Sequence, residues 1–174
     1  DASSPYVAIL ANRDYASYLS VVGVLASGKG YIPLNPKHPI KRIQQIIQET
    51  RPNLLIVSKN NLKVLDAVLK GISHKMKIIC VDQSNISDLK EKHKVQQFFS
   101  SEALAVCSST FLIKGVNPDS VAYLLFTSGS TGTPKGIPIS HKNVSAYLDN
   151  LAKHYPLQPD DRISQTSDLT FDFS

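Results

Sequence analysis

Residues 123–136 read YLLFTSGSTGTPKG, and the change of composition within this stretch decides the local fold. Residues 121–126 form an apolar run that suits a buried strand, whereas residues 127–136 consist only of Gly, Ser, Thr, Pro and Lys. Such a mixture suits neither a strand interior nor a helix interior. We therefore expect a strand to end at Phe126, a flexible loop to follow, and a second short strand to occupy residues 137–139.

The predicted loop offers the groups that bind a polyphosphate. Glycine lets backbone N–H groups approach a ligand, hydroxyl groups donate hydrogen bonds, and Lys135 adds a compact positive charge. The pattern differs from a Walker A loop, because Pro134 precedes Lys135 and a strand follows instead of a helix. A polar hairpin loop is the alternative, since Ser, Gly and Pro also dominate turns. The residues concerned are Thr127, Ser128, Gly129, Ser130, Thr131, Gly132, Thr133, Lys135 and Gly136.

The rest of the chain alternates between short apolar runs and amphipathic segments, which is typical of a parallel sheet covered by helices. We predict an α/β fold with a mostly parallel sheet flanked by helices. Residues 82–109 indicate one short helix and otherwise a surface connection. The predicted strands are residues 6–11, 31–34, 54–57, 77–81, 121–126, 137–139 and 162–166, and the predicted helices are residues 13–26, 40–49, 62–69, 100–105 and 140–154.

The caps of two helices and one histidine carry further expectations. Asn12 or Asp14 is expected to cap the first helix, and Ser140 to cap the last. His141 has two interpretations: it lies near a ligand, or it is a first-turn side chain of the last helix that packs on the loop. The second is favoured, because the sequence places no partner beside it.

Composition argues against several classes of protein. The formal net charge is +5, but the basic residues are scattered, which predicts solvated surfaces and no nucleic-acid partner. Cys80 and Cys107 form no CxxC pair, which favours free thiols in a reducing compartment over a disulfide or a metal site. Neither a membrane span of about 18 apolar residues nor a signal peptide is visible. We expect a soluble, cytoplasmic protein.

Residues 124–136 resemble the phosphate-loop signature of the adenylate-forming (AMP-binding) enzymes, which include adenylation domains of nonribosomal peptide synthetases, carrier-protein ligases for single amino acids, acyl-CoA synthetases and luciferase. Residues 25–47, LASGKGYIPLNPKHPIKRIQQII, resemble a second motif of adenylation domains, with Asn35 where Asp is usual. The resemblance implies that residues 127–135 bind ATP with Mg²⁺ and that Lys135 is catalytic, stabilising charge on the departing pyrophosphate. Residues 25–47 are assigned packing and turn roles only.

Residues 171–174, Phe-Asp-Phe-Ser, resemble the Phe-Asp-x-Ser motif of the members that activate amino acids. The resemblance implies that Asp172 pairs with the α-ammonium group of the substrate. A carboxylate between two aromatic rings also loses hydration and seeks a cation, which agrees with this role. The alternative is a turn residue that caps a following helix.

Taken together, the resemblance implies that the parent enzyme adenylates an amino acid with ATP and passes it to the phosphopantetheine thiol of a carrier protein. We expect residues 1–174 to be a partial N-terminal subdomain, inactive alone, whose exposed sheet edge could pair with a second copy. Two alternatives stay open: activation of a fatty or aryl acid with coenzyme A as acceptor, and a non-catalytic nucleotide-binding or scaffold module.

Overall fold

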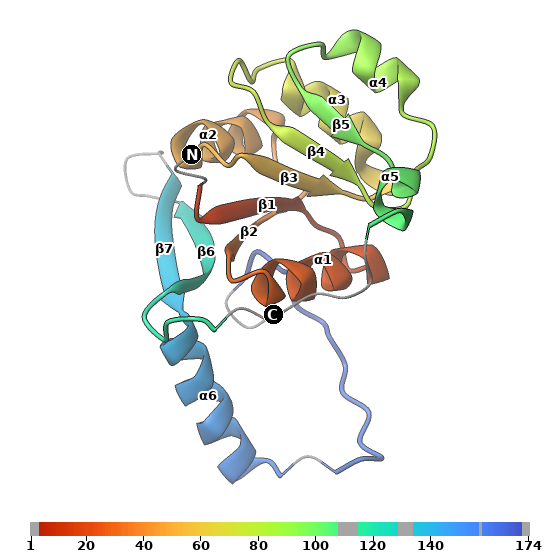
Figure 1. Ribbon diagram of the computed structural model, residues 1–174. Coiled ribbons are helices and arrows are strands. Elements are labelled where there is room, and N and C mark those ends of the chain that lie inside the picture. Colours follow the sequence, from red (N-terminus) through yellow and green to blue (C-terminus); the bar gives the residue numbers. More distant parts are fainter. Residues whose placement is uncertain (1–3, 108–114, 129–133, 157, 172–174) are drawn as a thin grey trace.

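A computed structural model describes residues 4–107, 115–128, 134–156 and 158–171. Within these residues seven strands form one sheet in the order β5-β4-β3-β1-β2-β6-β7, and every neighbouring pair is parallel except β6 and β7 (Figure 1). The predicted class is therefore confirmed. The strands are β1 (Tyr6–Leu10), β2 (Gly30–Leu34), β3 (Leu54–Val57), β4 (Lys77–Cys80), β5 (Gln97–Phe99), β6 (Val121–Ser128) and β7 (Pro134–Ser140). The helices are α1 (Tyr15–Ala26), α2 (Ile40–Thr50), the short 3-10 helix η1 (Lys59–Asn61), α3 (Leu62–Leu69), α4 (Ser87–Lys92), α5 (Ser101–Ala105) and α6 (His141–His154).

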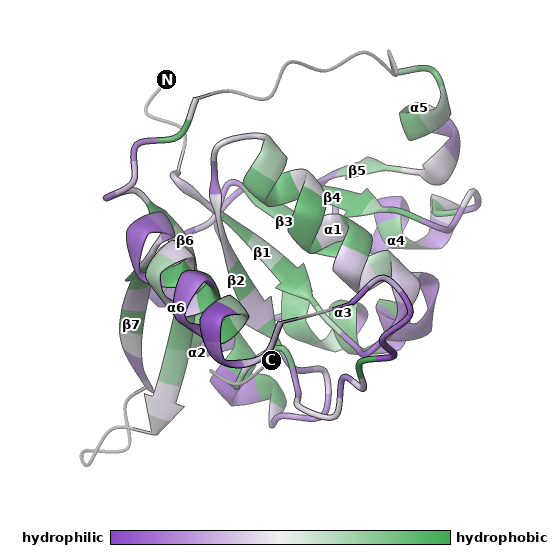
Figure 2. Cartoon of the chain, turned by 90° about the horizontal axis from the view of Figure 1, so that it is seen from below, coloured by the Kyte–Doolittle hydropathy of each residue, from purple (hydrophilic) through white to green (hydrophobic). Residues whose placement is uncertain are grey.

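The sheet has two unequal faces. Side chains alternate along β1, so Ala8 and Leu10 join the apolar cluster beneath α2 and α3, while Val7 and Ile9 join a smaller cluster beneath α1. Both faces of the central strands are buried, which explains their uninterrupted apolar sequences and their largely green colour in Figure 2.

Helix α2 presents the strongest amphipathic pattern and buries it fully. Its Ile43, Ile46 and Ile47 are no more than 4% exposed and pack in the larger cluster. The helix ends at Arg51, whose φ of 43° is left-handed. The following Pro52 cannot continue a helix, so the chain turns into β3.

Helix α1 forms where the sequence predicts it, but three residues of its predicted apolar stripe face outward, while Leu25 packs against the smaller cluster. Tyr15, Leu19 and Val22 are 79%, 51% and 62% exposed, respectively. Two serines face the sheet instead: the Ser17 hydroxyl accepts a hydrogen bond from the Asn12 backbone N–H at 2.9 Å, and Ser20 donates to the Ala16 carbonyl at 2.6 Å. Small side chains with locally satisfied hydroxyls let α1 approach the sheet.

Asp14 is the N-cap of α1, since its side chain accepts a hydrogen bond from the Ser17 backbone N–H at 2.9 Å. Of the two residues proposed for this role, Asp14 is thus the one observed. At the other end Gly28 adopts a φ of 75°, a left-handed conformation that glycine reaches without strain.

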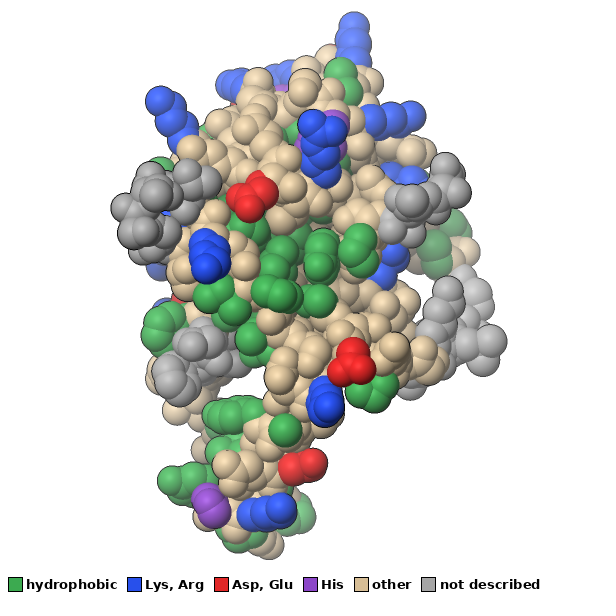
Figure 3. All heavy atoms as spheres, turned by 90° about the vertical axis from the view of Figure 1, so that its left-hand side faces the viewer, with side chains coloured by type: hydrophobic (Ala, Val, Ile, Leu, Met, Phe, Trp, Pro, Cys, Tyr) green, Lys and Arg blue, Asp and Glu red, His purple; other side chains and the backbone are tan. Residues whose placement is uncertain are grey.

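Helix α6 projects from the sheet instead of covering it. Ser140 caps it as predicted, in a capping box in which the Asn143 side chain accepts from the Ser140 backbone N–H. None of its side chains is buried, and Tyr147 and Leu148 are 60% and 53% exposed. Figure 3 shows apolar side chains on the surface of this projection.

The strand predicted for residues 162–166 is wrong. These residues are exposed and irregular, and Ile163 is 73% exposed. The run looks like a strand in sequence, but a strand needs a neighbour to bond its backbone, and no described strand lies in register with it.

Residues 82–107 are more ordered than the predicted surface connection. They add α4 and the edge strand β5, whose Leu89 and Phe98 join the larger apolar cluster. Helix α4 and strand β5 are too short to leave a periodic signal in the sequence.

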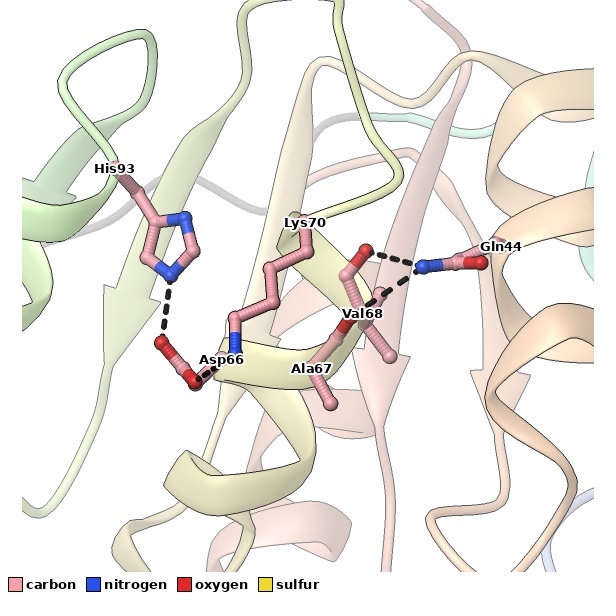
Figure 4. A network of polar contacts seen from close by, with 6 residues as sticks. All are labelled: Gln44, Asp66, Ala67, Val68, Lys70 and His93. Atoms are coloured by element: carbon pink, nitrogen blue, oxygen red, sulfur yellow. Dashed lines mark hydrogen bonds and ion pairs between the residues drawn. The ribbon is translucent and has the colours of Figure 1, made fainter.

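Polar contacts join α3 to its neighbours. The Asp66 carboxylate of α3 accepts from His93 Nε2 at 2.9 Å and pairs with the Lys70 ammonium at 3.2 Å (Figure 4). In the same view Gln44 of α2 donates to the Val68 carbonyl of α3 at 3.0 Å.

The described cysteines are free, as predicted: Cys80 is buried in β4 and Cys107 is exposed. Burial, with a smaller contribution from the Asp82 charge, raises the pKa of the Cys80 thiol to about 11. Among the described residues, no helix combines the length and the apolar character that crossing a membrane requires.

Candidate active site

The β6–β7 hairpin is the strand-loop-strand that the sequence predicts, but its strands are longer. Thr127 and Ser128 still belong to β6, where they pair with Lys135 and Pro134 of β7. The expectation that the loop begins at Thr127 is therefore wrong, because cross-strand hydrogen bonding extends the ladder into the polar residues. Only the connection between Ser128 and Pro134 remains for the loop, and Gly129, Ser130, Thr131, Gly132 and Thr133 lie outside the described residues.

The pairing places two predicted ATP-binding residues side by side. Lys135 stands directly opposite Thr127, and both are exposed. Side chains of directly opposed residues have Cβ atoms about 5 Å apart, so an ammonium group and a hydroxyl group can serve one ligand. The ladder thus presents a positive charge with a neighbouring hydrogen-bond donor.

Gly136 has a packing role that the sequence does not reveal, while its predicted approach to a ligand stays a prediction. It pairs with Phe126, and a Cβ atom at this position would lie 3.1 Å from the Phe126 ring and 3.3 Å from the Leu124 side chain. The missing side chain makes room for the aromatic ring beside the hairpin. The sequence alone does not distinguish this use of glycine from a close approach to phosphate.

Helix α2 contacts the hairpin through Arg42. Arg42 donates from Nη2 to the Phe126 carbonyl at 3.2 Å, while its Nε atom is buried without a partner among the described residues. This contact joins residues 84 positions apart and fixes the last apolar residue of β6. The motif at residues 25–47 therefore contacts the predicted phosphate-binding hairpin directly.

A second segment reaches the same region from the end of the chain. The Thr166 carbonyl accepts from Arg13 Nη1 at 2.8 Å, and Leu169 is buried in the cluster beneath α1. The Asp168 carboxylate accepts from Asn35 Nδ2 at 2.7 Å. These contacts hold residues 166–171, the segment that leads to the predicted substrate residue Asp172, which itself lies outside the described residues.

Topology brings the two segments to one edge of the sheet. Strands β1, β2 and β6 are parallel, so Leu34, Asn35 and Ser128 all lie at their carboxyl ends. A small cavity there has both segments in its wall, through Phe126 of the hairpin and Thr170 of the final segment. Open α/β sheets bind ligands outside the carboxyl ends of their strands, so this edge is the candidate active site.

The charges at this edge are mixed. Burial and the nearby Arg42 charge lower the pKa of His38, while Asp168 acts in the opposite direction. The described residues hold no group of three or more His, Cys, Asp or Glu side chains suited to a metal ion. Hydroxyl groups, an ammonium group and a guanidinium group are suited to an anionic ligand.

His141 lies at the other end of the hairpin. Its backbone N–H donates to the Ser120 carbonyl at 3.0 Å, next to the amino end of β6, and its Nε2 atom is buried. His141 does belong to the first turn of α6, but the predicted phosphate loop follows the opposite end of β6, so the expected packing on that loop is not what this position indicates.

Sequence reasoning missed Asn35, Arg42 and Asp168 as members of the site. Arg42 and Asn35 lie in a motif that was assigned to packing, and Asp168 precedes the Phe-Asp-x-Ser motif. The only available signal was the position of Asn35, where the resembling domains usually carry Asp.

Comparison with known proteins defines the class. The family model "AMP-binding enzyme" matches residues 2–174, and the chain therefore belongs to this family. The structure resembles the crystal structure of the Vibrio cholerae adenylation domain AlmE in complex with glycyl-adenosine-5'-phosphate, with a TM-score of 0.82 and 31% identity over 97% of this chain and 32% of that chain. Within the family, the chain corresponds to the N-terminal part of an adenylation domain.

Two curated relatives agree with this placement. The chain is 28% identical to zwittermicin A synthase ZmaJ of Bacillus cereus, over 97% of this chain and 27% of the relative. It is 33% identical to the nonribosomal peptide synthetase ivoA of Emericella nidulans, over 97% of this chain and 9% of the relative. The chain thus spans well under a third of each of these two relatives.

Proposed function

We propose that the protein containing this chain activates an amino acid with ATP, giving an aminoacyl-adenylate and pyrophosphate. A carboxylate oxygen of the amino acid attacks the α-phosphorus, and the bond from that phosphorus to the bridging oxygen of pyrophosphate breaks. The observation that carries the proposal is that the hairpin with the Lys135–Thr127 pair and residues 166–171 reach one edge of the sheet, where Phe126 and Thr170 line the same small cavity. The likeness to AlmE, whose crystal structure contains glycyl-adenosine-5'-phosphate, supports it.

Within this proposal each residue has a physical task. Lys135, the Thr127 hydroxyl group and Ser128 are proposed to bind the outer phosphates, and the Lys135 charge offsets the charge that develops on departing pyrophosphate. Mg²⁺ neutralises phosphate charge when it is bound with ATP, and such ions are usually held by substrate phosphates with only one or two carboxylates. Gly129, Ser130, Thr131, Gly132 and Thr133 are proposed to complete the phosphate loop, and Asp172 to pair with the substrate ammonium group.

The acceptor and the setting belong to the same proposal. We propose that the aminoacyl group passes to the phosphopantetheine thiol of a carrier protein, forming a thioester and releasing AMP. The relatives named a synthase and a nonribosomal peptide synthetase support an assembly-line setting, and we propose the cytoplasm as its location. The activity is proposed for the whole polypeptide, with residues 1–174 as a partial subdomain that is inactive alone and whose sheet edges can pair with a second copy.

ATP–pyrophosphate exchange by the full-length protein across a panel of amino acids tests the proposal. We expect exchange with one or a few amino acids, and a loss of about 10²- to 10³-fold in kcat in Lys135→Ala, because a preorganised charge is removed. Lys153→Ala, which alters an exposed lysine in the last turn of α6, is the matched control and should keep full activity.

Three outcomes would contradict parts of the proposal. Exchange with no amino acid, in a protein that still binds ATP, would favour a non-catalytic nucleotide-binding module. Exchange driven by fatty or aryl acids, unaffected by Asp172→Ala, would favour a coenzyme A ligase. Unchanged kcat in Lys135→Ala would remove that residue from the catalytic role.

A further inference from the structure

Asn35 joins two parts of the candidate site that are 133 residues apart in sequence. Its Nδ2 atom donates to Asp168 Oδ2 at 2.7 Å, and its Oδ1 atom accepts from the Lys37 backbone N–H at 2.8 Å. The same side chain therefore orders the turn after β2 and holds the final segment. An amide supplies both, because its N–H group donates and its oxygen accepts, whereas an ionised carboxylate could only accept.

Asp168 also forms hydrogen bonds with the residues that follow it. Its Oδ1 atom accepts from the Thr170 backbone N–H at 2.9 Å and from the Thr170 hydroxyl at 2.7 Å. Its backbone carbonyl accepts from the Phe171 N–H at 2.9 Å. The Asp168 carboxylate is thus the centre of a tight turn, and Asn35 is the contact that ties this centre to the sheet.

Two other contacts of the described final segment differ in kind from this one. Arg13 binds the Thr166 carbonyl at an exposed position, where water competes for the hydrogen bond. Leu169 anchors the segment by its burial in the smaller apolar cluster, but apolar packing does not define the orientation of the segment. The Asn35–Asp168 hydrogen bond is short, partly buried and charge-assisted, so it defines the orientation of the turn.

We propose that Asn35 is a positioning residue that holds the Asp168–Phe171 turn against the carboxyl end of β2 and thereby aligns the amino-acid part of the active site. This inference rests on the proposed function, because the turn leads directly to Asp172. Asn35 does not touch the reacting atoms in this proposal. Its loss should weaken amino-acid binding and leave ATP binding nearly unchanged.

Two substitutions in the full-length protein separate the two contacts of Asn35. Asn35→Ala removes both hydrogen bonds. Asn35→Asp keeps the acceptor for Lys37 and loses the donor to Asp168, and two ionised carboxylates at this spacing repel unless they share a proton. Asn53→Asp is the matched control, because Asn53 is exposed and precedes β3, at the opposite edge of the sheet.

Amide hydrogen exchange of residues 168–171 gives a readout that does not depend on activity. We expect faster exchange at Thr170 and Phe171 in Asn35→Ala, and in Asn35→Asp at pH values where both carboxylates are ionised. Asn53→Asp should match the unaltered protein. Unchanged exchange in both Asn35 variants would overturn the proposal.

Steady-state ATP–pyrophosphate exchange supplies the functional readout. We expect the KM for the amino acid to rise about tenfold in Asn35→Ala, the effect of losing a charged, partly buried hydrogen bond, with the KM for ATP within about twofold. In Asn35→Asp the amino-acid KM should approach the unaltered value at low pH and rise as the shared proton leaves. His38 interacts electrostatically with Arg42 and with Asp168, so a pH dependence of the amino-acid KM that Asn35→Ala also shows is assigned to His38.

The outcomes distinguish failure of this inference from failure of the proposed function. If the KM for the amino acid rises in Asn35→Ala but at no pH in Asn35→Asp, the contact of Asn35 with Lys37 matters and the contact with Asp168 does not. Faster amide exchange without a change in amino-acid KM would also overturn the positioning role. No activity with any amino acid would overturn the proposed function, while amide exchange would still decide whether Asn35 holds the segment.

Discussion

The two faces of the sheet use helices of similar length in opposite ways. Helix α2 buries Ile43, Ile46 and Ile47 against one face. Helix α1 fully buries only two serines and Val24 against the other face, packs Tyr18, Val21 and Leu25 there in part, and exposes Tyr15, Leu19 and Val22. An apolar hollow of about 670 Å³ lies between α1 and the strands, lined by Leu19, Ile56 and other side chains. The α2 and α3 face is therefore a finished core, and the α1 face is only partly covered.

This difference teaches that helix formation and helix burial are separate outcomes. Apolar residues at helical spacing stabilise either arrangement, but only burial converts them into tertiary stability. The face that is finished is also the one whose helix α2 contacts the candidate site through Arg42. A rigid support under the hairpin suits a site that depends on preorganised charge.

The largest expected effect comes from matched truncations on the two faces. Ile47→Ala, at a side chain that is 0% exposed, should lower the free energy of unfolding by ~2–5 kcal/mol, because it leaves a cavity. Leu19→Ala on α1 should change it by less than ~0.5 kcal/mol. Urea denaturation of the 174-residue chain measures both. Equal costs would contradict the comparison and would mean that α1 is covered in solution.

An intermediate effect is expected at the start of α1. Asp14→Ala removes the side-chain acceptor for the Ser17 N–H and should cost ~1 kcal/mol of stability. Asp149→Ala, at an exposed position of α6, is the control and should stay within ~0.5 kcal/mol. Both are measured by urea denaturation, and a cost for Asp14→Ala no larger than the control would show that packing alone sets the beginning of α1.

The smallest effect concerns the edge of the finished face. Hydrogen bonds from His93 and then Lys70 lower the pKa of Asp66, so its stabilising contribution is present above the usual carboxylate pKa and is lost as pH falls through the lowered value. Asp66→Asn should therefore cost less than ~1 kcal/mol near pH 6, and the difference should shrink below about pH 4. Thermal unfolding of both proteins from pH 3 to 6 measures it. A difference that grows on acidification would have the wrong sign.

Much of the fold could be predicted, and the misses have a common cause. The limits of β3 and α3 agree with the prediction to the residue, because each is a clean apolar or amphipathic run between breakers. The prediction placed a strand at residues 162–166 that does not form, and it missed α4 and β5. Strands and short helices depend on their neighbours as much as on composition. The extension of β6 through Thr127 and Ser128 likewise needed β7 as a partner.

The site was predicted in part. Lys135 and Thr127 were predicted from composition and are brought together by the hairpin, and their binding of ATP stays a prediction. The packing of Gly136 against Phe126 was not predicted. Asn35 and Asp168 were not found as a pair, because nothing in a local pattern relates residues so far apart.

The sequence by itself determined the element types, the hairpin that carries Lys135 and the resemblance to adenylate-forming enzymes, because these depend on short-range periodicity, turn chemistry and contiguous motifs. Only the tertiary structure decided which side of α1 faces solvent and which residues link the hairpin, the turn after β2 and the final segment. Those outcomes follow from the register of the parallel strands, which brings their carboxyl ends, and the segments attached to them, to one edge.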